Sequence, residues 1–182
     1  MTTKKLVVLV AVLLLAATVG FAQTATHTVT ITIADFGVIG LNSVADVPFS
    51  TTAPALPGNN PGPLVGAPAT DNSKSLFYTT ANLTGKTRHI TVGSDVNPPA
   101  GTSLTVNAAM AAGAGTNAGP ATVSTATVDL VTAISSVATG RIAGTSGAAL
   151  TYSFWVSNPA LLVVGASPTV VTVTYTMTAD TY

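Results

Sequence analysis

Cysteine and glutamate are absent from this 182-residue chain, and histidine occurs only twice. Without cysteine the fold cannot contain disulfides, and the chain lacks the residue that carries the lipid of a bacterial lipoprotein. A zinc site takes three or four side-chain ligands, and His27 and His89 have neither cysteine nor glutamate to complete one. We therefore expect the core and the hydrogen-bond ladders to provide the stability, and we expect no metal and no cofactor.

Charged residues are also scarce, at 7% of the chain. Apart from Lys4 and Lys5, four basic residues stand against six aspartates, so residues 23–182 carry four minus six, or −2. This composition lacks the cationic surface that binding to nucleic acid or to anionic lipid requires, and we expect neither as a partner. Low charge also means weak repulsion between copies, which favours self-association.

The N-terminal 22 residues have the features of a secretory leader. Two lysines precede an unbroken apolar run over residues 6–17, and the small residues around Gly20 and Ala22 fit a signal-peptidase site. The run is shorter than the roughly 20 residues that cross a bilayer. We expect a helical signal peptide over 1–22, cut after Ala22, a secreted or cell-surface protein, and no membrane attachment after cleavage.

Threonine alternating with apolar residues is the main positive signal, because β-branched side chains pack well on a pleated surface. The stretch QTATHTVTITIADFG, residues 23–37, reads as one long strand with Val29, Ile31 and Ile33 on its apolar face. Near the other end, threonines alternate with Val171, Val173, Tyr175 and Met177. These two stretches have the strongest periodicity in the chain.

Between them the pattern predicts further short strands, each bounded by Gly, Pro or Asn, at 74–81, 86–93, 103–110, 121–134 (the weakest) and 150–157. No helical segment intervenes, which indicates an antiparallel β-sandwich rather than a parallel α/β sheet. The length of 23–182 fits a single domain. Six prolines in residues 48–68 predict a long exposed loop, either a plain connector or a contact with a neighbour or a ligand.

No catalytic arrangement is recognisable, so we expect no enzyme. The aspartates are scattered, and no serine lies in a nucleophile elbow. We expect His27 and His89 to be solvated at threonine-side positions of their strands, where an imidazole needs no partner. Asp95 and Asn97 could offer oxygens to calcium, although a turn explains them equally well. Trp155 falls on the outward face of its strand, where it would stack on a sugar or pack under a neighbouring loop or subunit.

The plan of leader, Thr/Val strand, short strands, the segment HITVGSDVNPPAGTSLTVNA (89–108) and the closing TVVTVTYTMTADTY (169–182) resembles secreted bacterial β-sandwich proteins of the spore-coat-U and fimbrial-subunit kind. The resemblance covers residues 23–182 through patterns of alternation. It implies an Ig-like or fimbrial-type sandwich that a strand of the next subunit completes. The chain itself lacks the cysteine pair that is common in chaperone-assembled pilins.

By this resemblance, residues 23–35 are the donor strand, with Val29, Ile31 and Ile33 as donor positions. The acceptor edge would include Val171, Val173, Tyr175 and Met177. The apolar face of the donor must be covered, most usefully by another copy, and the hypothesis fails if Val29, Ile31 and Ile33 lie in water. Pairing of this strand within its own chain is the alternative, and the sequence does not decide between the two.

We therefore expect a secreted structural protein, a self-assembling subunit of an extracellular filament, pilus-like fibre or surface coat, with copies of itself as partners. The alternative is a monomeric cell-surface adhesin or carbohydrate-binding module. That protein would bind a surface glycan through the proline-rich loop and Trp155.

Overall fold

The computed structural model describes residues 28–50, 68–140, 147–163, 165 and 168–180. The predicted signal peptide at 1–22, His27 and most of the proline-rich loop lie outside these residues. The chain divides into two units between Thr32 and Ile33, and all of the strands belong to the second unit.

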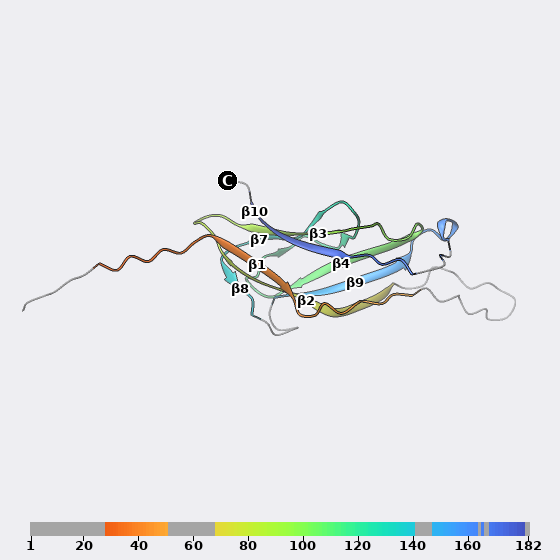
Figure 1. The fold of residues 1–182 in the computed structure, drawn as a ribbon, viewed down its shortest axis with the longest axis horizontal. Helices are drawn as coiled ribbons and strands as arrows, with labels where there is room; N and C mark the ends of the chain where they lie inside the picture. The colour runs from red at the N-terminus through yellow and green to blue at the C-terminus, as the bar shows by residue number, and fades with distance from the viewer. Residues whose placement is uncertain (1–27, 51–67, 141–146, 164, 166–167, 181–182) are drawn as a thin grey trace, which may run out of the picture. The chain divides into compact units, whose positions relative to one another are not determined.

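The described residues of the second unit form two antiparallel sheets (Figure 1). The order in the first is β1-β2-β9-β4-β6, with β8 also pairing with β2, and the order in the second is β10-β3-β7-β5. The strands of the first sheet are β1 Phe36–Leu41, β2 Ala69–Ala81, β4 Thr102–Met110, β6 Ala121–Thr122, β8 Val137–Ala138 and β9 Ala148–Val156. Those of the second are β3 Arg88–Ser94, β5 Thr116–Asn117, β7 Val128–Ile134 and β10 Val173–Ala179.

The described residues contain no α-helix, and their only helical piece is the 3₁₀ turn Pro159–Leu161. Within these residues the fold is all-β, and every strand pairing in the two sheets is antiparallel. The prediction of an all-β, antiparallel chain is therefore confirmed.

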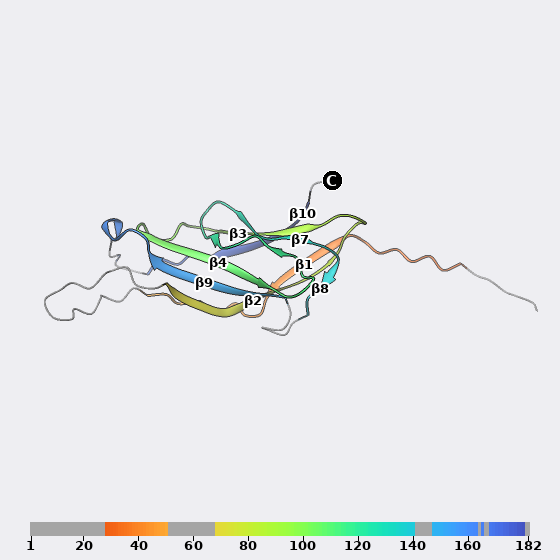
Figure 2. The same cartoon turned by 180° about the vertical axis from the view of Figure 1, so that it is seen from behind.

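One apolar core is shared by the two sheets. The residues of the core follow the two-residue period of the strands. In β4, Leu104, Val106 and Ala108 are buried, while Ser103, Thr105 and Asn107 remain accessible. The first sheet contributes Leu76, Tyr78, Val106 and Leu150, and the second contributes Ile90, Val92, Leu130 and Ile134. Figure 2 shows β9, the central strand of the first sheet, between β2 and β4.

Four of the predicted strands, 74–81, 86–93, 103–110 and 150–157, correspond to β2, β3, β4 and β9. The prediction of one strand over 121–134 is wrong, because β6 and β7 are separate there. The backbone between them turns, and its shape is held from outside: Ser94 N donates to Ser124 O (2.8 Å) and Thr125 N donates to Oδ1 of Asn97 (3.0 Å).

The strand predicted over 23–37 differs from the structure in its position. Ladder pairing begins only at Phe36, opposite Ala81 of β2, and residues 28–35 are not assigned to a strand. Alternation in the sequence therefore identifies an extended segment with an apolar face, but not whether a neighbouring strand is present. In the single chain, the described part of this stretch before Phe36 is not assigned to a strand and pairs with no neighbour.

Candidate functional site

The predicted acceptor positions lie on an edge strand. β10 is the outermost strand of the second sheet and pairs with β3 along its whole length, from Val173 opposite Ser94 to Ala179 opposite Arg88. Its other edge has no ladder partner among the described residues. Val173, Tyr175 and Met177 belong to β10, and Val171 lies two residues before it.

The two faces of β10 differ as the alternation predicts. Val171, Val173, Tyr175 and Met177 pack against the core, and the threonines between them are exposed. The four inward side chains are nevertheless only half-buried, whereas Ile90 and Val92 on the adjacent strand β3 are fully buried. The side of the core next to β10 is therefore incompletely covered.

Asp95 fixes the first end of β10. Thr172 N donates to Oδ1 of Asp95 (2.8 Å), and Asp95 N donates back to Thr172 O (3.2 Å). The bond from Thr172 lowers the pKa of Asp95. Val96 N also donates to the same carboxylate, and Asn97 Oδ1 accepts from Thr125 N. The side-chain oxygens of Asp95 and Asn97 thus accept hydrogen bonds from backbone N–H groups at turns and at the start of β10.

Asp180 fixes the other end. Its carboxylate accepts from the Thr87 hydroxyl and lies 2.6 Å from Nδ1 of His89, and both interactions lower the pKa of Asp180. The expectation that His89 has no partner is wrong. The partner is 91 residues away in the sequence, and the pairing of β10 with β3 brings the two side chains together.

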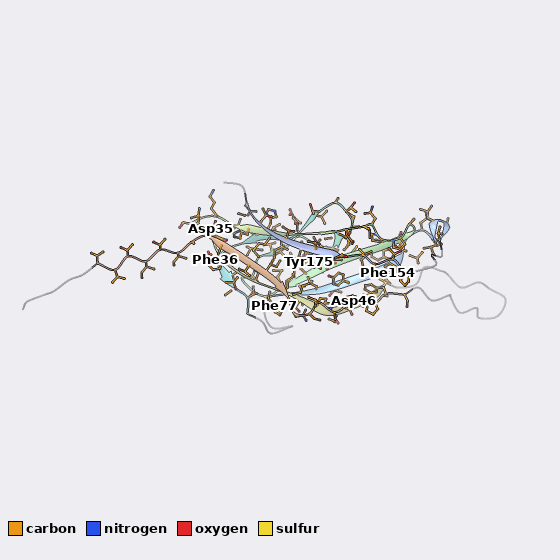
Figure 3. The ribbon with its side chains drawn as sticks, in the orientation of Figure 1. Asp35, Phe36, Asp46, Phe77, Phe154 and Tyr175 are labelled. Atoms are coloured by element: carbon orange, nitrogen blue, oxygen red, sulfur yellow. The ribbon has the colours of Figure 1, made fainter. Side chains whose placement is uncertain are left out.

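A pair of tyrosines joins the two sheets beneath β10. The hydroxyls of Tyr152, on β9, and Tyr175, on β10, lie 2.5 Å apart, and burial raises the pKa of both groups. Tyr175 is labelled in Figure 3. Each hydroxyl thus has a polar partner, as burial requires. The inward face of β10 is therefore apolar with one polar bridge, rather than a hydrophilic cleft.

The predicted donor positions are uncovered. Val29, Ile31 and Ile33 are 67, 80 and 76% exposed, and Thr28 to Asp35 are all exposed. The single chain therefore does not meet the condition that the apolar face of the donor be covered, and only a second copy could supply that cover. This exposure leaves three large apolar side chains in water, which is costly if the chain remains single.

β1 and the segment after it cover part of this side of the core, which the sequence pattern did not predict. Gly37 approaches β10 so closely that a Cβ there would lie 2.7 Å from Sδ of Met177. Asp35 forms a 2.7 Å ion pair with Arg88. Phe49, within the predicted exposed loop, instead stacks on Phe154 at 5.6 Å. A possible signal was the alternation of Val47 and Phe49 around a proline.

Trp155 lies on β9 opposite Ser103 of β4, one residue from the core-facing Val156, and is half-buried. It belongs to the face directed away from the core, as its position in the alternation predicts. Of the other residues in the proposed sugar site, most of the proline-rich loop is outside the described part of the chain.

Among the described residues, no three His, Asp or Glu side chains gather as metal ligands, and none of the helices there is long and apolar enough to cross a membrane. The chain matches no protein-family model, no curated protein and no solved structure. Its own edges, exposed segments and contacts are thus the basis for inferring what it does.

Proposed function

We propose that this chain is a secreted structural protein whose copies assemble into an extracellular filament, pilus-like fibre or surface coat by β-strand complementation. The domain is then an Ig-like or fimbrial-type β-sandwich with incomplete cover beside β10. Residues 28–33 of one copy add to the open edge of β10 in the next. The leader at 1–22 supports export.

One observation carries the proposal. The same chain has an edge strand with a half-buried apolar face and a terminal segment with the matching alternation, whose apolar side chains are exposed. Alternate side chains along a strand are spaced by about 6.6–6.8 Å, so Val29, Ile31 and Ile33 have the spacing of Val173, Tyr175 and Met177. With these facing inward, Thr28, Thr30 and Thr32 would join the outward threonines of β10, and Thr–Thr pairs stabilise neighbouring strands.

The energies are sufficient for stable assembly. Burying three such side chains contributes about 5–9 kcal/mol as an upper estimate, and each new ladder hydrogen bond adds about 1 kcal/mol. This is comparable with the stability of a whole domain, about 5–15 kcal/mol. Neither residues 28–33 nor β10 carries a charged side chain, so adding these residues to β10 desolvates no charge of either segment.

The test compares two exposed apolar positions in residues 23–182. Ile31→Asp places a charge in the donor face, and Val44→Asp is the matched control, because Val44 is 93% exposed and lies outside the donor. We expect filaments or large assemblies by electron microscopy and size-exclusion chromatography for the unsubstituted chain and for Val44→Asp. Ile31→Asp should elute as a folded monomer with unchanged thermal stability.

Two results would contradict the proposal. One is an unsubstituted chain that remains monomeric, and the other is assembly that Ile31→Asp leaves intact. A soluble monomer that binds glycans, and loses binding on Trp155→Ala, would support the adhesin instead.

A further inference from the structure

A second apolar surface lies on the first sheet, on the face directed away from the core. Phe36 is 43% exposed and Val38 is 62% exposed on β1, and Phe77 of β2 is half-buried beside Gly40. Figure 3 labels Phe36 and Phe77 on this pair of strands. Farther across the same sheet, the outward residues of β4 are Ser103, Thr105 and Asn107. The apolar patch formed by Phe36, Val38 and Phe77 lies at the β1 edge, and the outward face of β9 farther across the sheet carries Trp155.

The patch contains a hollow of about 520 Å³, whose lining includes Val38, Gly40, Phe77, Thr79 and Gly140. Among the described residues, no atom outside Gly40 and its two chain neighbours lies within 4 Å of where a Cβ of Gly40 would be, and the backbone there does not have a positive φ. Neither space nor backbone conformation therefore requires glycine. A glycine inside a strand weakens it and often marks the close approach of another group. We conclude that Gly40 keeps the hollow open.

We propose that this patch is a self-complementary lateral contact between two copies of the chain, in which Val38 of each copy enters the hollow over Gly40 of the other. Val38 and Gly40 are two residues apart on one face of β1, so a two-fold axis passing over Ile39 places each Val38 opposite the other copy's Gly40. Such an isologous contact needs one surface to carry both knob and hole, and this one does.

The size and charge of the patch determine when the contact forms. β1 and Phe77 bring no charge to it, and the nearby Asp35 is paired with Arg88, so two copies approach without like-charge repulsion. Only three side chains form the patch, which is far fewer than the roughly 20–30 residues a side that bury about 800 Å² per partner in a stable complex. A single pair of copies should thus not remain associated. In the filament of the proposed function, on which this inference rests, the contact repeats and its effects accumulate.

The experiment uses filaments of residues 23–182 and measures lateral bundling by electron microscopy and low-speed sedimentation. Gly40→Val fills the hollow, and we expect it to weaken each lateral contact about tenfold and to leave single, unbundled filaments. Valine favours strands, so thermal stability should be equal or higher. The matched control Thr105→Val changes an outward residue of the same sheet away from the patch and should bundle normally.

The double variant Val38→Gly/Gly40→Val exchanges knob and hole within each copy. Under the two-fold arrangement the new valine meets the new glycine of the partner, so bundling should return. Bundling that Gly40→Val leaves unchanged, or that the double variant does not restore, would overturn the lateral contact while single filaments still support the proposed function. Absence of any filament from the unsubstituted chain would overturn both.

Discussion

The two sides of the domain end in different kinds of edge. On one side the outermost strands are β5 and β6, with two residues each, while on the other they are β1, with six, and β10, with seven. Short edge strands offer little backbone for another chain to pair with. Long edges without charge or proline offer a template, and neither β1 nor β10 has a charged residue or a proline.

The cover over the core differs in the same way. Beside the short edges, Ala114, Ala121 and Val123 are at most 5% exposed, and the Tyr78 hydroxyl donates to Ala114 O. Beside β10 the inward side chains are only half-buried. We therefore call the first the closed side and the second the open side. The strand addition proposed above would take place on the open side, where the cover is incomplete.

A cysteine pair tests the comparison with an all-or-none result, since the native chain has no cysteine. A chain with Thr30→Cys and Thr174→Cys, or with Thr30→Cys and Thr176→Cys, should form disulfide-linked multimers, because strand pairing brings Cα atoms within the approximately 4.4–6.8 Å that a disulfide needs. Non-reducing electrophoresis after mild oxidation measures the series of disulfide-linked multimers. The control combines Thr30→Cys with Thr122→Cys, because Thr122 lies in β6 on the closed side. If the control formed as many disulfide-linked multimers, the open and closed sides would not differ in their capacity to pair with another copy.

Core truncations should separate the two sides in a monomer kept soluble by Ile31→Asp. Leu130 is fully buried, so Leu130→Ala should lower the free energy of unfolding by about 3 kcal/mol, through lost burial and a cavity. Val173 is half-buried on the open side, and Val173→Ala should cost about 1 kcal/mol or less. Urea denaturation measures both. Equal losses would mean that β10 already has complete cover in the single chain.

Alkaline pH should act on both sides through the tyrosines. Burial raises the pKa of Tyr78 to about 12 from 10.0 and also raises those of Tyr152 and Tyr175. The folded state therefore holds protons that the unfolded chain releases, so stability is complete below pH 10 and falls as the pH rises toward 12. Urea denaturation between pH 9 and 12 measures the fall. In Tyr78→Phe the free energy of unfolding should fall less steeply with pH. An unchanged slope would contradict the raised pKa of Tyr78.

Acid pH should have the smallest effect, confined to the ends of β10. The lowered pKa values of Asp95 and Asp180 mean that their contribution is complete above the ordinary value of 3.8 and is lost as the pH falls below it. Both carboxylates are accessible, so the loss is small. Asp95→Asn and Asp180→Asn should speed amide exchange in β10 but not in β7. Equal acceleration in both strands would indicate a general loss of stability.

Features of this fold that follow from a local pattern are predictable from the sequence, whereas features that depend on distant residues are not. Alternation in β4 and β9 is a two-residue period, and it marks the buried face directly. By contrast, the turn between β6 and β7 depends on Asn97, and the environment of His89 depends on Asp180. Phe49 stacks on Phe154 across more than a hundred residues of chain. Such contacts have no local signature.

The sequence by itself determined an all-β chain, the apolar and hydroxyl faces of its strands, its low charge and its lack of disulfides, because composition and a two-residue period are properties of the chain alone. Only the tertiary structure decided that β10 is an edge, that β1 begins at Phe36 and leaves a hollow at Gly40, and that the two sides differ in cover. Those features depend on which strands become neighbours, and neighbours are chosen by the packing of the whole domain.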